Sequence, residues 1–156
     1  MYDYSNDDRF HKRKHPRLKA YNYTQRGFYF ITICTNEKKC FFGNPVVLNQ
    51  YGKIVEIELM EITNHYSGIR IDKYVIMPNH IHFIVEITED GTDLLNIIGS
   101  FKSVVTRKIH QFEPKLTLWQ TSFHDHVIRN QKSYERIWNY IDGNPSKWEE
   151  DCFYPG

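Results

Sequence analysis

Residues 69–87 read IRIDKYVIMPNHIHFIVEI, which is two apolar stretches joined by Pro78 and Asn79. Both stretches are rich in the β-branched residues that favour strands, and a Pro-Asn pair is typical of a tight turn. The pattern predicts a β-hairpin around this turn. Because alternate side chains of a strand point the same way, His80 and His82 share one face of its second strand, and apolar side chains take the other.

The spacing of apolar residues on either side of the hairpin predicts two more strands and three helices. The strands are expected at 28–34 and 126–128, and the helices within 51–66, 94–109 and 134–141. Gly143 and Pro145 are stop signals after the last helix. This order of elements predicts an α+β fold of the ferredoxin-like split β-α-β type: an antiparallel sheet, two helices on one face, and an additional C-terminal helix.

Polar residues mark the ends and the outer sides of the predicted helices. Thr92 or Asp93 is expected to cap the second helix, and Ser133 the third, because their side chains can accept hydrogen bonds from unpaired backbone N–H groups. Glu58 and Glu61 are expected on the solvent side of the first helix.

The chain of 156 residues has the length and composition of one globular domain, with 40% hydrophobic and 25% charged residues. No apolar run approaches the ~18–20 residues of a membrane span, and the polar, acidic N-terminus is unlike a secretory signal. We therefore expect a soluble, cytoplasmic protein that does not bind membranes. The three cysteines include no C-x-x-C pair, so the sequence indicates neither a disulfide framework nor a thiolate zinc site.

The net charge of +1 conceals an uneven distribution of charge. Six basic residues and no acidic residue lie between positions 9 and 19, while the acids concentrate elsewhere. Taken alone, such a run is typical of a solvated tail. We expect residues 1–26 to form a basic N-terminal arm and residues 27–156 to form a single domain.

The pair His80 and His82 is the most informative motif. The two residues are ~6.6 Å apart along a strand, so their imidazoles can converge on one metal ion. Two ordinary histidines on a half-exposed strand explain the pair equally well. A histidine-triad hydrolase is excluded, because Ile84 stands where a third histidine is needed. Glu86 fits the spacing of a cupin, but three long helices disfavour the jelly roll of that class.

Tyr140 lies about 110° from the centre of the apolar stripe of the last helix, and therefore off its core-facing side. Asn144 follows four residues later on the same flank. By itself Tyr140 would be a boundary aromatic residue with a packed ring and a solvated hydroxyl.

Together these motifs resemble the REP-associated tyrosine transposases of bacteria, a branch of the single-tyrosine HUH transposases, over nearly the whole chain. The resemblance rests on residues 27–33 (GFYFITI), 74–82 (YVIMPNHIH), 119–120 (WQ), 124–126 (HDH) and 140–145 (YIDGNP), and on the basic arm. It implies a metal-dependent endonuclease and strand transferase that acts on hairpin-forming single-stranded DNA through a 5′-phosphotyrosine intermediate.

The resemblance also implies roles for individual residues. His80 and His82 would bind a divalent metal ion, Mg²⁺ or Mn²⁺. Tyr140, on the C-terminal helix, would be the nucleophile, and Asn144 would complete the metal shell. The enzyme would work as a monomer or a homodimer.

Single-stranded DNA with hairpin structure is the expected partner, held through its phosphates by the cations of the arm. These expected DNA contacts are Arg9, Lys12, Arg13, Lys14, Arg17 and Lys19. Lys102 and Arg107 are lesser candidates, for which an ordinary solvated helix face is the better interpretation. Two alternatives stay open: a domesticated hairpin-binding protein with little or no cleavage, and a cupin-like metalloenzyme.

Overall fold

A computed structural model describes residues 22–156, so the six expected DNA contacts of the arm lie outside the described part. One antiparallel sheet forms the centre, with the strand order β2-β3-β1-β4. The strands are β1 Gly27–Cys34, β2 Ile69–Met77, β3 His80–Ile87 and β4 His124–Ile128. This is the ferredoxin-like arrangement that the sequence predicts, and it excludes the cupin jelly roll.

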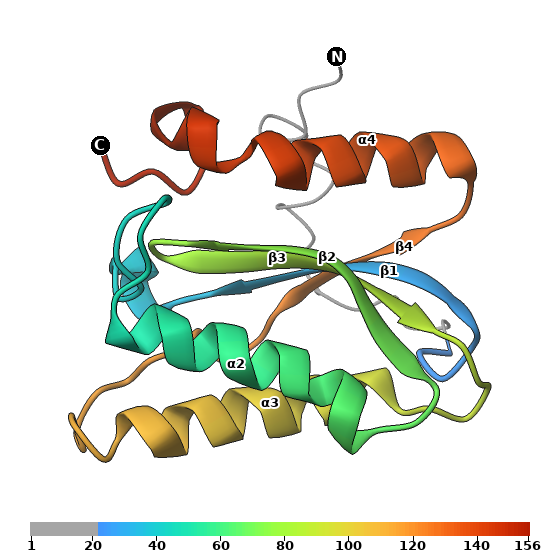
Figure 1. Cartoon of the computed structure of the whole chain (residues 1–156), viewed down its shortest axis with the longest axis horizontal. Coiled ribbons are helices and arrows are strands. Elements are labelled where there is room, and N and C mark those ends of the chain that lie inside the picture. The colour runs from blue at the N-terminus through green and yellow to red at the C-terminus, as the bar shows by residue number, and fades with distance from the viewer. Residues whose placement is uncertain (1–21) are drawn as a thin grey trace.

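Helices cover both faces of this sheet (Figure 1). The long helices are α2 Gln50–His65, α3 Leu94–Ile109 and α4 Gln131–Gly143, and the short 3₁₀ helices are η2 Asn36–Lys38 and η3 Pro145–Glu150. Helices α2 and α3 lie on one face, as predicted, and the additional C-terminal helix, α4, lies on the other. None of the described helices is long and apolar enough to cross a bilayer.

Strand alternation divides the interior into two apolar clusters. Tyr29, Ile31 and Ile33 of β1 belong to the larger cluster, which α2 and α3 cover. Phe30 points the other way and packs with Ile137 in the smaller cluster beneath α4. Both faces of β1 are therefore buried, and this explains why the strand is apolar at nearly every position.

Helix α4 is fixed on the sheet by polar contacts with β2. The Tyr134 hydroxyl donates a hydrogen bond to Asp72. Lys73 makes an ion pair with Asp142, with Nζ 2.8 Å from Oδ1, and the same Nζ lies 3.9 Å from the centre of the Trp138 ring. Contacts along three turns of α4 therefore set its position over the sheet.

The ends of two elements differ from the sequence-based expectation. Asn130, not Ser133, caps α4, because its side chain accepts a hydrogen bond from the Ser133 backbone N–H and starts the helix three residues earlier. Asp93 is the cap of α3, where it accepts from Asn96 N–H. Strand β4 begins at His124, two residues before the predicted start.

Glu58 was expected on the solvent side of α2, and this prediction is wrong. Its side chain is buried and forms an ion pair with Lys108 of α3. The residue lies on the flank of α2 that faces α3, so the neighbouring helix covers it. The apolar period of α2 alone does not contain this information.

Candidate active site

His80 and His82 open strand β3, which lies between β2 and β1 at the centre of the sheet. Both side chains point toward the α4 face, and neither residue has any exposed surface. The centres of the two rings are 4.6 Å apart. The alternative of two ordinary histidines on a half-exposed strand is therefore wrong, and a pair of imidazoles buried side by side needs a specific explanation.

Strand pairing fixes the ring of His82. Thr32 is its register partner on β1, and Thr32 Oγ1 lies 2.8 Å from His82 Nδ1. Phe30 stacks on the same ring at 5.2 Å between centres. The other ring nitrogen, Nε2, lies 3.4 Å from the Tyr140 hydroxyl.

Asn79, in the hairpin turn, fixes the ring of His80. Its amide nitrogen donates to the carbonyl oxygens of Lys38 and Phe153, at 3.0 and 2.8 Å, so Oδ1 is the acceptor end of the side chain. His80 Nδ1–H donates to this Oδ1 at 2.8 Å. In the neutral imidazole the lone pair is then on Nε2, which lies 3.6 Å from Asp151 Oδ2.

Tyr140 of α4 is partly buried, with its ring centre 5.3 Å from that of His82. Tyr134, two turns earlier, is the other tyrosine on this helix. Burial and the hydrogen bond to Asp72 raise the pKa of Tyr134 to about 12, which keeps that phenol protonated. Only Tyr140 of these two brings its hydroxyl to the histidines.

Asn144 follows the last residue of α4 and keeps helical torsions, with φ −59° and ψ −44°. The stop signals at Gly143 and Pro145 therefore do not disturb the four-residue spacing from Tyr140. Asn144 is 3% exposed, and its Nδ2 donates to Asp151 Oδ2 at 2.7 Å. Its Oδ1 is buried and accepts no hydrogen bond from any residue in the described range 22–156.

These side chains form a group that fits a metal ion. His80, His82 and Asp151 each offer one ligand atom, and these atoms lie within 4.8 Å of one another. Asn144 borders the group, because its Nδ2 donates to Asp151 Oδ2 while its Oδ1 is buried and unsatisfied within the described residues. Imidazole nitrogens with carboxylate and amide oxygens are ordinary ligands of divalent ions.

The segment after α4 closes the site. Asp151 Oδ1 accepts a hydrogen bond from the Phe153 backbone N–H at 2.8 Å, and the Phe153 ring packs on His80 at 4.4 Å between centres. Sequence reasoning missed both residues, and it counted Asp151 only among the acids that lie outside the basic arm. No local pattern could have found them, because a fold-back of the chain brings them to β3.

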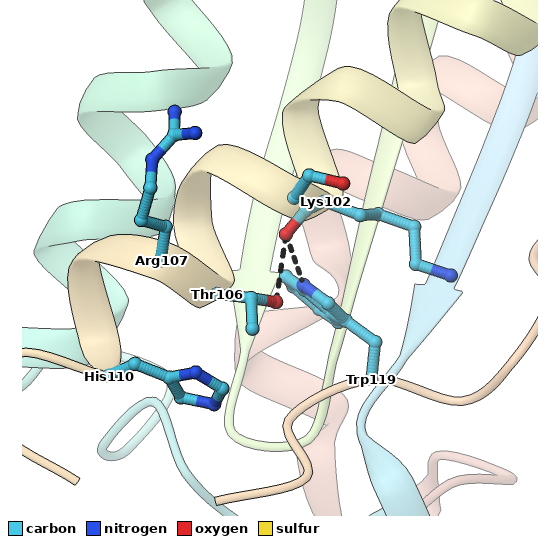
Figure 2. A pocket seen from close by; sticks show the side chains of 6 residues that line it. Lys102, Thr106, Arg107, His110 and Trp119 are labelled. Carbon is cyan, nitrogen blue, oxygen red and sulfur yellow. Dashed lines mark hydrogen bonds between the residues drawn. The ribbon is translucent and has the colours of Figure 1, made fainter. Parts of the chain in front are cut away.

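Lys102 and Arg107, the lesser DNA-contact candidates, lie away from this site on α3, which covers the opposite face of the sheet. With Trp119 and His110 they line an open pocket of about 470 Å³. Figure 2 shows that the two basic side chains leave the helix in different directions. Lys102 Nζ donates to the carbonyl oxygen of Gln120 at 2.9 Å. The two cations therefore do not point toward a common position in the pocket where one phosphate could bind both.

Comparison with known proteins shows the family to which the chain belongs. Residues 22–144 match the family model described as "Transposase IS200 like". A Haemophilus influenzae protein described as uncharacterized is 38% identical over an alignment of 169 residues, covering 92% of this chain and 94% of the relative. The REP-associated tyrosine transposase of Escherichia coli K12 is 34% identical, covering 80% of this chain and 70% of the relative.

A solved structure of a REP-associated tyrosine transposase bound to a REP hairpin has the same fold, with a TM-score of 0.62. It is 21% identical in sequence, and the match covers 85% of this chain and 74% of that one. The chain therefore belongs to the IS200-like transposase family. Within that family it groups with the REP-associated tyrosine transposases.

Proposed function

We propose that this protein is a metal-dependent endonuclease and strand transferase that acts on hairpin-forming single-stranded DNA. One observation carries the proposal: the Tyr140 hydroxyl lies 3.4 Å from Nε2 of the buried His82. A nucleophile beside a metal-capable group is the constellation that phosphoryl transfer needs. The same two histidines without Tyr140 would define only a metal site.

His80, His82 and Asn144 would hold the divalent ion, Mg²⁺ or Mn²⁺. When bound, the ion supplies positive charge that neutralises a phosphate oxygen as negative charge develops. The protein contributes the orientation of the ligands. Thr32 and Asn79 each bind the Nδ1 side of one imidazole and leave the Nε2 sides toward the site, an arrangement common in histidine ligands of metals.

Tyr140 Oη would attack phosphorus and form a 5′-phosphotyrosine bond as the P–O3′ bond breaks. The phenol proton is lost to solvent, and the leaving 3′ oxygen gains a proton and departs as a free 3′-OH. One phosphodiester bond is broken and one is formed, so no ATP is consumed. A second 3′-OH can reverse the step and join strands.

Single-stranded DNA with a hairpin is the proposed substrate. The structural neighbour bound to a REP hairpin supports a hairpin partner. Tyr140 is only partly buried, and a nucleophile on a helix would reach phosphorus most readily on a strand without a complementary strand in the way. The cations of the basic arm, which lie between positions 9 and 19, would hold the phosphates of the stem.

The proposal is tested with labelled hairpin oligonucleotides taken from the repeats that flank the protein's own gene. Wild-type protein with Mn²⁺ or Mg²⁺ is expected to cleave the strand and to form an adduct that survives denaturation. Tyr140→Phe should form none, and a chelator should stop the wild type. Tyr134→Phe, on the same helix, is the matched control and should retain the adduct.

The alternative of a hairpin-binding protein without cleavage gives a different result in the same assay. Wild-type and His80→Ala proteins would bind the hairpin equally, and neither would cleave it with any divalent metal. An adduct formed by Tyr140→Phe would instead show that another residue is the nucleophile.

A further inference from the structure

We propose that Asp151 supplies a carboxylate ligand to the metal ion, so that the segment following α4 is part of the metal centre. This inference rests on the metal-dependent function proposed above. It adds a negatively charged ligand to a set that otherwise contains only neutral groups. It also assigns a function to a residue outside the histidine and tyrosine motifs.

The distances suit a shared ion. Two ligands bound about 2.1 Å from one ion are about 3.0 Å apart at a right angle and about 4.2 Å apart on opposite sides. His80 Nε2 and Asp151 Oδ2 are 3.6 Å apart, within this range. All three ligand atoms of the group lie within 4.8 Å of one another, so shifts of about half an ångström bring them around one ion.

The polar atoms also suit a cation at this point. Because His80 Nδ1 is held by Asn79, Nε2 is the ring nitrogen that can coordinate an ion, and it faces a carboxylate oxygen of Asp151. Both side chains have no exposed surface, and His80 is the only basic side chain among residues 22–156 within 4 Å of that carboxylate. A buried carboxylate is costly without a compensating charge. A divalent ion between the two groups supplies it.

The two oxygens of Asp151 have separate contacts. Oδ1 accepts from the Phe153 backbone N–H at 2.8 Å and holds the turn of the chain. Oδ2 faces His80 and accepts from Asn144 Nδ2 at 2.7 Å, which orients the amide and leaves Asn144 Oδ1 without a partner in the described part of the chain. Oδ2 is therefore the oxygen that is placed to act as a ligand.

Binding of Mn²⁺ without DNA tests the inference, measured from the electron paramagnetic resonance signal of free Mn²⁺. The full chain is compared with Asp151→Asn, and with Glu150→Gln as a control that removes the same charge from an exposed neighbour. Asp151→Asn should raise the dissociation constant about tenfold or more. Glu150→Gln should change it less than about twofold, because exposed charges act weakly.

The outcomes separate the two proposals. An Asp151→Asn dissociation constant equal to that of the wild type, alongside lost binding in His80→Ala, would overturn the role of Asp151 and leave the histidine site intact. A wild type that binds no Mn²⁺ would overturn the metal site, and this inference with it.

A second variant gives a positive signal that a structural role cannot produce. Asp151→Cys with Co²⁺ should show a sulfur-to-cobalt charge-transfer band, because a thiolate at position 151 would then contact the ion. The wild type, which carries Cys152, and Glu150→Cys set the baseline. Bound Co²⁺ without a new band in Asp151→Cys would contradict the inference.

Discussion

Thr32 sets the direction in which His82 presents its ring. Its hydroxyl lies 2.8 Å from His82 Nδ1, inside the sheet and away from solvent. Thr32→Val keeps the shape of the side chain and removes this hydrogen bond. We expect about a tenfold loss of Mn²⁺ affinity and a loss of about 1 kcal/mol in the free energy of unfolding. Mn²⁺ titration and urea unfolding measure the two effects.

Thr106→Val is the matched control for this prediction. Thr106 lies on α3, and its hydroxyl donates to the Lys102 carbonyl oxygen (Figure 2). Helix α3 covers the face of the sheet opposite α4 and the histidines (Figure 1). The Thr106→Val variant should leave the Mn²⁺ affinity unchanged. Equal affinities for both variants and the wild type would show that Thr32 does not orient a ligand.

Some of the site residues can be predicted because their relations are local in the sequence. Two positions along a strand bring His80 and His82 to one face, and four positions along a helix bring Asn144 to the flank of Tyr140. Asp151 is different, because it reaches His80 through a fold-back after α4 that follows no periodic pattern. Thr32 likewise lies 50 residues from His82, and only the strand register pairs them.

Helix α4 carries Tyr140, and its start depends on Asn130. The Asn130 side chain accepts a hydrogen bond from the Ser133 N–H at 2.8 Å. Asn130→Ala leaves this N–H unpaired and should lower the free energy of unfolding by about 1 kcal/mol, measured by urea denaturation. Ser133→Ala should have a much smaller effect. The reverse ranking would show that Ser133 is the cap, as the sequence alone suggests.

Long elements are predicted well from apolar periodicity, and their ends are not. The β-hairpin of β2 and β3 and the three long helices each extend over many residues, and the apolar spacing along each of them indicates the same element throughout. Strand β4 begins with His124 and Asp125, which carry no strand signal, and it forms because β1 offers an edge for pairing. The burial of Glu58 depends in the same way on Lys108 of the neighbouring helix.

The two faces of the sheet differ in what they contain. The α4 face contains the histidines and the tyrosine, and the face covered by α2 and α3 contains the larger apolar cluster. Hairpin affinity is expected to depend on the basic arm, with residues 27–156 as the single domain that cleaves. This division of the chain is a prediction from the charge distribution.

Removal of residues 1–19 should weaken hairpin binding and reduce its dependence on salt. If six cations each neutralise one phosphate, the slope of log affinity against log salt concentration should decrease by about 4–5. Fluorescence anisotropy at several salt concentrations measures both quantities. Lys102→Gln with Arg107→Gln is the control and should change them little, because these side chains diverge on α3. An unchanged slope in the shortened chain would exclude the arm from binding.

The central claim is that Tyr140 is the nucleophile of a metal-dependent DNA-cleaving site. Mass spectrometry of peptides from protein that has reacted with hairpin DNA in Mn²⁺ tests it most directly. We predict a nucleotide linked through phosphate to Tyr140, and none when the metal is removed by a chelator. A nucleotide on any other residue, or cleaved DNA without a covalent link to the protein, would contradict the account.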